Sequence, residues 1–404
     1  MVGATLTLGF FLVARQLGFA PGLSVLGALL LLLTTPHLYF ARTLYSENLQ
    51  ATLVVWSMLA WLRSREQPTR RRLIVLGLLL GLALHAKAIL AVLGVAVLID
   101  WLWDRPRARE LWRRGVWTFM GALPGLLGWF AYNWVRYGNL LETGYGTERD
   151  GVIGFGTPLF AGLHGLLLSP GKSVFLYAPL TFIALFGVRA MARQHPRALC
   201  FVAIVGGGVL ASTAKWWAWS GDWTWGPRLL MAALPLYALP ALWVLLQHGR
   251  IARALIALAL LFGLFVSVLG ISLWPSQYLS VAQSATKSAV GKHERGMPIR
   301  DELVLVHQVP ELSPIVGHAW LLSRAASGQP WHEGDFYPWQ SLGIDAWRVR
   351  QDPTPEHVCY WYNRSPTTWV MLALGLSLVL ASGLWLRRSL QALSEPNAAQ
   401  SAPR

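Results

Sequence analysis

The sequence is poor in charged residues and in cysteine. Only 13% of its 404 residues are charged and 54% are hydrophobic, whereas soluble domains carry about 25% charged residues. This deficit argues against an ordinary soluble domain. The apolar residues come in blocks close to the length that crosses a hydrocarbon core of about 30 Å, which predicts a polytopic membrane protein.

Cysteine, metal-ligand spacings and a cleavable leader are also missing. The two cysteines, Cys200 in an apolar run and Cys359 in a polar one, predict neither an internal disulfide nor a metal site. Met1 leads directly into an apolar stretch without a basic region, so no cleavable signal peptide is expected. The net charge of +15 would suggest nucleic acid in a soluble protein. In a membrane protein it shows instead which loops hold arginine, and no nucleic-acid partner is expected.

Arginine is concentrated in alternate connections between the apolar blocks. RSREQPTRRR (63–72) and DRPRARELWRR (104–114) hold five arginines each. Shorter basic turns are RQHPR, QHGRIAR and LRRSLQ. The positive-inside rule places these connections in the cytoplasm and the remaining ones outside. About 11 transmembrane helices are predicted, at 2–15, 22–38, 48–62, 73–85, 87–102, 115–134, 174–191, 198–214, 229–246, 254–274 and 367–386.

The predicted fold class is an all-α polytopic membrane protein with a small extracytoplasmic segment. Residues 1–274 form the multi-span domain, with outer loops at 135–173 and 214–228. Residues 275–366 are predicted to be an outer α/β or irregular cap, 367–386 the last span and 387–404 a cytoplasmic tail. The short spans 73–85 and 87–102 are typical of a broken pair that lines a cavity. The loop parity places Met1 outside, so a further span upstream is expected.

The outer loop KWWAWSGDWTWGPRLL (215–230) combines five tryptophans with one aspartate. An aromatic belt at the membrane surface explains the tryptophans. It does not explain Asp222, or Arg228 at the mouth of the next helix. An aromatic face with an acid suits a sugar ring, and the arginine fork suits a phosphate. The candidate substrate-binding residues here are Trp217, Asp222, Trp223 and Arg228.

Four other outer stretches carry candidate site residues, each with a simpler structural alternative. Arg42 and Glu47 precede a span, where Glu47 could merely complement the helix dipole. Lys87 lies between apolar runs, where ionisable groups are often functional but can also snorkel. SPGKS (169–173) lacks the full phosphate-loop pattern, yet Lys172 could meet a lipid-linked phosphate. YNWVRYGNLLETGYG (132–146) adds Arg136 and Tyr145, with an interfacial helix end as the alternative.

LYFARTLYSEN, LGLLLGLALHAKA, YNWVRYGNLLETGY, SPGKSVFLYAP and WWAWSGDWTWGPRLL, in this order, resemble bacterial GT-C glycosyltransferases. That superfamily includes the protein O-mannosyltransferases and the aminoarabinose transferase of lipid A. The resemblance covers about residues 1–250. It implies a multi-pass enzyme of the bacterial inner membrane that takes a sugar from a polyprenyl-phosphate carrier on the outer side. Glu47 and Lys87 match an acid and a lysine of the family's donor site.

One family feature is missing from this chain. The family's acidic residues in a first outer loop, which act as base or metal ligand, have no counterpart here, and the first helices match the family's second and third spans. Glu47 is therefore the candidate for an auxiliary catalytic acid, with a base upstream of Met1 as the alternative source of the deprotonating group, and the resemblance leaves a divalent metal open. The expected partners are a polyprenyl-phosphate-linked sugar, a lipid, glycan or protein acceptor, and membrane lipids. The alternatives are a transporter or flippase of lipid-linked sugars and a non-catalytic membrane subunit.

Overall fold

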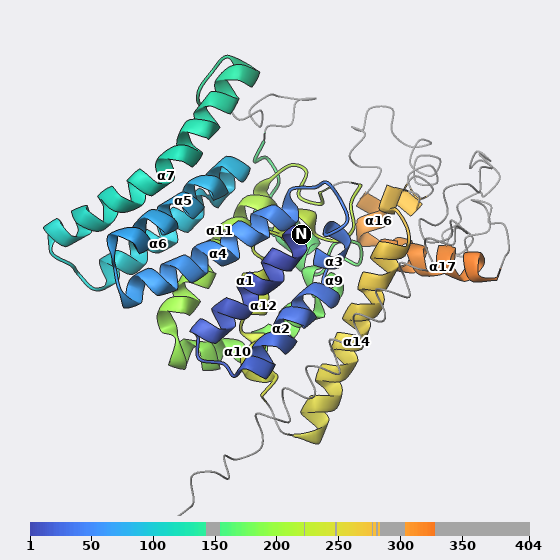
Figure 1. Cartoon of the computed structure of the whole chain (residues 1–404). Helices are drawn as coiled ribbons and strands as arrows, with labels where there is room; N and C mark the ends of the chain where they lie inside the picture. The colour runs from blue at the N-terminus through green and yellow to red at the C-terminus, as the bar shows by residue number, and fades with distance from the viewer. Residues whose placement is uncertain are drawn as a thin grey trace, which may run out of the picture.

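The computed structural model describes residues 1–142, 154–221, 223–246, 249–276, 278–279, 282 and 304–327, and these are helical with no strand among them (Figure 1). The all-α prediction is confirmed for this part of the chain. The elements are α1 (Val2–Gln16), α2 (Pro21–Leu33), α3 (His37–Phe40), α4 (Glu47–Glu66), α5 (Arg70–Ala86), η1 (Ala88–Ala91), α6 (Val92–Trp103), α7 (Ala108–Tyr137), α8 (Leu159–Leu167), α9 (Val174–Tyr177), α10 (Pro179–Gln194), α11 (Pro196–Lys215), η2 (Arg228–Leu230), α12 (Leu234–Ala238), α13 (Ala241–Val244), α14 (Arg250–Ser272), α16 (Val304–Gln308), η4 (Pro310–Leu312) and α17 (Pro314–Ala326).

The helices differ in whether their length and composition would let them cross a membrane. Among the described residues, α11 and α14 are long and apolar enough to cross a membrane by length and composition. Shorter apolar helices are α1, α2, η1 with α6, and the stretch Leu234–Val244. The predicted span 367–386 lies outside the described residues. The structure thus supports an apolar helical protein, and the predicted number of spans stays a prediction.

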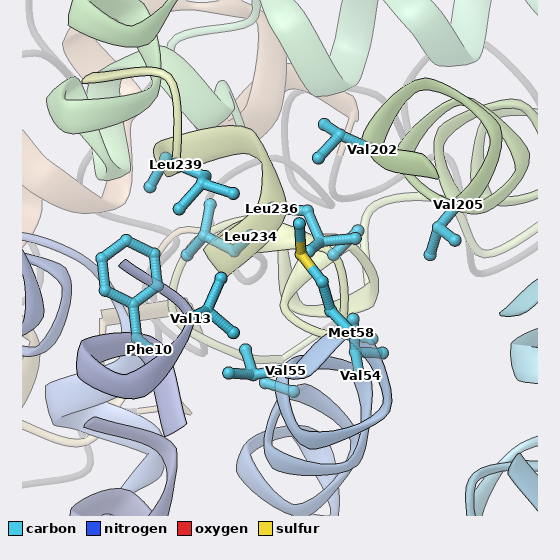
Figure 2. Packing of buried hydrophobic residues seen from close by; sticks show 14 of the residues in the cluster. Phe10, Val13, Val54, Val55, Met58, Val202, Val205, Leu234, Leu236 and Leu239 are labelled. Carbon is cyan, nitrogen blue, oxygen red and sulfur yellow. The ribbon is translucent and has the colours of Figure 1, made fainter. Parts of the chain in front are cut away.

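The predicted span 229–246 was wrong as one continuous helix. The structure divides it into η2, α12 and α13, because Pro235 and Pro240 cannot donate a helical hydrogen bond. Figure 2 shows Leu234, Leu236 and Leu239 packed against side chains of α1, α4 and α11. All three leucines are buried. The broken stretch therefore passes through the centre of the bundle.

Helices α5 and α7 lie alongside each other (Figure 1) and pack through glycine. Each has two glycines four residues apart, Gly77 and Gly81 on α5 and Gly121 and Gly125 on α7. A methyl group on Gly77 would come within 1.9 Å of the Thr118 carbonyl oxygen. Small residues at this spacing let helix backbones approach closely, which is a common packing mode in membranes.

The basic turns gather at one end of the helices. Arg65 lies 3.3 Å from Asp100, and Arg197 lies 3.6 Å from the same carboxylate. Arg113 also donates to the Pro68 carbonyl over 3.3 Å. The turns around 63–72, 104–114 and 193–197 are therefore neighbours, as one shared membrane side requires.

Residues 304–327, which belong to the predicted cap 275–366, form the helices α16, η4 and α17. Most of this segment lies outside the described residues, so its predicted α/β or irregular form stays a prediction. These helices bury their own small apolar cluster, which includes Tyr278, Leu312 and Leu321. Each of η4 and α17 begins with a proline, Pro310 and Pro314, which is a favoured residue in the first turn of a helix.

The charge asymmetry predicts that the two ends of the bundle face opposite sides of the membrane. In a chain with both native cysteines replaced by alanine, we expect Leu44→Cys to react with an impermeant maleimide added to intact cells. Arg71→Cys should react only after the cells are opened. Both residues are exposed, so unequal burial does not explain a difference. Labelling of both positions from the same side would contradict the proposed topology.

Candidate functional site

Glu47 and Arg228 form an ion pair between residues 181 positions apart in the chain. Arg228 Nε donates to Glu47 Oε1 over 2.5 Å. Glu47 is only 2% exposed, whereas the Arg228 side chain is 30% exposed. The other oxygen, Glu47 Oε2, is buried and has no hydrogen-bond partner among the described residues. The pair therefore offers an available carboxylate oxygen next to a partly exposed guanidinium.

Lys87 completes the charged cluster. Helix α5 ends at Ala86, and Lys87 adopts an extended backbone before η1 begins. Its partly buried side chain interacts electrostatically with both Glu47 and Arg228. The three groups together carry two positive charges and one negative charge. An excess positive charge at a largely desolvated position favours an anionic ligand such as a phosphate.

Aromatic rings surround these charges. The Arg228 guanidinium lies over the Tyr45 ring, 4.3 Å from its centroid. Arg42 lies over the Trp274 ring at 5.4 Å and also donates to the Ile271 carbonyl at the end of α14. The buried Tyr39 packs edge-on against Trp274, with ring centroids 6.5 Å apart. The loop before α4 is thereby joined both to Arg228 and to α14.

The start of α4 is fixed by an amide clamp beneath Glu47. The Asn48 side chain donates to the His37 carbonyl oxygen over 3.1 Å. Its own oxygen lies 2.7 Å from His37 Nδ1. Both residues are buried, so these bonds are shielded from water and hold the chain from α3 to α4 in one shape. Glu47 is therefore presented by a rigid turn.

Arg136 lies at the end of α7, at the edge of this cluster. It is exposed, stacks over Tyr132 at 5.7 Å and donates to that residue's hydroxyl over 2.5 Å. Tyr132 in turn packs edge-on against His85, two positions before Lys87. Arg136 thus neighbours the turn that carries Lys87, although the structure records no contact between Arg136 and Glu47.

Lys172 lies in the interior of the fold, and its predicted contact with a lipid-linked phosphate stays a prediction. Its side chain is fully buried, and Nζ donates to the carbonyl oxygens of Thr224 over 2.8 Å and Gly226 over 3.3 Å. An ammonium group held in this way lies beneath the tryptophan loop and is not exposed to a ligand at the surface. The predicted residues Tyr145 and Asp222 lie outside the described residues.

The tryptophans of the loop divide into core and surface. Trp225 is completely buried and packs against Tyr177 and His318, with centroids 5.2 and 4.4 Å away. Trp217 is partly buried and packs beside Trp216 at 5.8 Å. Trp223 is 37% exposed. Trp223 is the better placed of these to meet a substrate, whereas Trp225 holds the loop in the fold.

Sequence reasoning missed Tyr45, Tyr39 and the clamp of His37 with Asn48. Tyr45 precedes Glu47 by two residues in LYSEN, and a tyrosine so near a candidate acid was the available signal. The clamp gave no such signal, because a histidine and an asparagine eleven residues apart have no characteristic spacing.

The described residues do not assemble a divalent-metal site. No group of three or more His, Cys, Asp or Glu side chains comes together in this part of the chain. Glu47, the acid of the cluster, is paired with a guanidinium, which opposes a second cation at the same oxygen. A metal, if the reaction uses one, would need ligands beyond those that the described residues bring together.

Residues 1–132 match the model of the dolichyl-phosphate-mannose-protein mannosyltransferase family. The matched range contains Arg42, Glu47 and Lys87, and it ends before Arg136, Lys172 and Arg228. No curated protein and no solved structure matches the chain. The match supports a membrane glycosyltransferase of the GT-C type, in agreement with the resemblance found in the sequence. It singles out no bacterial subfamily.

Proposed function

We propose that this chain is an integral glycosyltransferase of the bacterial inner membrane that moves a sugar from a polyprenyl-phosphate carrier to an acceptor on the outer side. The observation that carries the proposal is the Glu47–Arg228 ion pair beside Lys87. It lies between elements from distant parts of the chain, and one of these, α4, falls within the match to the mannosyltransferase family.

The cations suit the phosphate of the carrier. Arg228 uses Nε for Glu47, and no hydrogen bond of its terminal nitrogens is recorded among the described residues, so they can bind phosphate oxygens. Lys87 adds a second positive charge that interacts electrostatically with the same pair. Negative charge develops on the phosphate as the bond to the sugar breaks, and fixed cations stabilise that charge in the transition state.

Glu47 is the proposed general base of a single displacement. Its Oε2 atom accepts the proton of the acceptor hydroxyl while the acceptor oxygen forms a bond to the anomeric carbon. The bond from that carbon to the phosphate oxygen breaks, and polyprenyl phosphate leaves as the anion. Trp223 and Tyr45, both more than a third exposed, are the rings against which the sugar can stack.

Exposed apolar side chains on α7 and α14 support the membrane location. Helix α14 exposes Leu255, Leu258 and Leu261, each by more than 60%, which suits contact with lipid. On α7 the exposed apolar residues include Leu127 and Val135. A lipid-embedded carrier could approach the candidate site along such surfaces.

Binding of the carrier phosphate tests the proposal. Lys87→Ala and Arg228→Ala should each weaken binding of sugar-free C55 polyprenyl monophosphate in nanodiscs about tenfold or more, because a charge-assisted hydrogen bond contributes about 1.5–3 kcal/mol. Titration followed by tryptophan fluorescence measures this. Arg71→Ala, at the opposite end of α5, is the matched control and should bind as the unmodified chain does.

Three outcomes separate the rival functions. Wild-type affinity in both alanine variants, shown to be folded, would refute the proposed site. Tight binding with translocation of the labelled lipid between leaflets, but without sugar transfer, would favour a flippase. A chain that binds no polyprenyl phosphate would favour a non-catalytic subunit.

A further inference from the structure

Lys172 is a buried ammonium group that is bonded to the backbone of another segment. It lies on the turn before α9, and its Nζ donates to the carbonyl oxygens of Thr224 and Gly226, on either side of Trp225. Burying a charge is unfavourable unless it is well compensated. A lysine retained here therefore points to a specific shape that the loop must keep.

The part of the loop whose shape matters is the turn that leads into Arg228. Gly226 has a φ of +66°, and a methyl group there would come within 2.8 Å of the Tyr177 ring. The Gly226 carbonyl oxygen also accepts from the backbone N–H of Arg228 over 3.0 Å. One carbonyl thus receives both the Lys172 ammonium and the Arg228 amide, so the two residues are held in register through a single peptide unit.

Helix α16 contacts the turn that carries Lys172. The Gly171 N–H donates to the His307 carbonyl oxygen over 3.1 Å, and a methyl group on Gly171 would come within 2.7 Å of the His307 Cα. The His307 ring is buried. Its burial, together with the charge of Lys172, holds the pKa of His307 well below its ordinary value. The neutral His307 ring therefore adds no second positive charge near the Lys172 ammonium.

We propose that Lys172 is a positioning residue, which sets the Arg228 guanidinium against Glu47 and the donor phosphate by fixing the turn from Thr224 to Arg228. This inference rests on the proposed function. In this proposal Lys172 does not bind the phosphate itself. Binding of the carrier depends on Lys172 because Lys172 fixes the position of Arg228. The contact of α16 with Gly171 helps to hold Lys172 in the position that this role requires.

A double-mutant cycle distinguishes positioning from direct contact. The chains compared are Lys172→Met, Arg228→Ala, the double variant and the unmodified protein, titrated with sugar-free C55 polyprenyl monophosphate in nanodiscs. If Lys172 acts through Arg228, each single variant should weaken binding about tenfold and the double variant by no more than either alone. Lys215→Met, which removes a partly buried lysine at the other end of the loop, should bind normally.

Two outcomes of the binding measurement would overturn the inference. One is wild-type affinity for Lys172→Met; the other is multiplication of the two effects to about a hundredfold, which independent phosphate contacts produce. Gly226→Ala strains the same turn with the ammonium intact, and its effect should likewise vanish in the Arg228→Ala background. If Lys172→Met and Gly226→Ala both fail to fold while Lys215→Met folds, Lys172 is only structural and the inference fails. Wild-type affinity of both Lys87→Ala and Arg228→Ala refutes the proposed function instead, whatever Lys172 does.

Discussion

Glu47→Gln is expected to reduce sugar transfer by about a hundredfold to ten-thousandfold, the usual contribution of a general base. Glutamine fills the same volume but has no lone pair basic enough to take the acceptor proton. The measurement is transfer from polyprenyl-phosphate mannose in proteoliposomes, with mannose chosen because the matched family uses it. Binding of sugar-free polyprenyl phosphate should be unchanged or tighter, since a negative charge beside the phosphate has been removed.

This experiment is informative because Glu47→Gln should lower sugar transfer without weakening phosphate binding. If the Glu47–Arg228 ion pair were only structural, Glu47→Gln would lower the free energy of unfolding. Sugar transfer and phosphate binding would then fall together. Glu66→Gln provides the matched control, because Glu66 ends the helix that Glu47 begins, at the basic end of the molecule. Full transfer activity in folded Glu47→Gln protein would remove Glu47 from the mechanism.

Gly121→Ala and Gly77→Ala are expected to lower the free energy of unfolding by about 1–3 kcal/mol each, the range for an overfilled interior. A methyl group on Gly121 would come within 2.1 Å of the Ile74 carbonyl oxygen, so α5 and α7 must separate to admit it. The lost packing is not replaced by another contact. Thermal unfolding in nanodiscs, followed by circular dichroism, measures the change.

Gly115→Ala is a control of opposite sign on the same helix. Nothing lies within 4 Å of a methyl group built on Gly115, and alanine is a better helix former than glycine by up to about 1 kcal/mol. This variant should therefore be slightly more stable than the unmodified chain. Equal destabilisation by Gly115→Ala and Gly121→Ala would show that the close helix contact is not what matters.

The apolar helices could be predicted from the sequence because their length and composition are local properties. Glu47, Lys87 and Arg228 were also accessible, since ionisable groups at the ends of apolar runs are conspicuous. Their pairing was not accessible: nothing in the sequence says that Arg228 meets a carboxylate 181 positions earlier. Only the tertiary fold determines that distance.

Lys172 and the stretch from 229 to 246 show two features that the sequence did not predict, the burial of a lysine and the interruption of a helix. A lysine in a Gly/Pro turn is usually exposed. The complete burial of Lys172 depends on the tryptophan loop and on α16, which pack against its turn. The apolar composition of residues 229–246 predicted one span. That prediction gave too little weight to Pro235 and Pro240, which interrupt the helix. The hydrophobicity of this stretch indicates that its side chains are buried, but it does not indicate whether the backbone is one continuous helix.

The position of the first turn of α1 decides where other polypeptides can be attached. The Val2 carbonyl oxygen accepts from the Thr52 hydroxyl over 3.4 Å, and a methyl group on Gly3 would touch Asn48. A tag, a reporter or a grafted acidic loop joined to Met1 would thus emerge beside the first turns of α4, the helix that begins at Glu47. Such a fusion can obstruct the candidate site, or deliver a second carboxylate to it, without altering any residue of the chain.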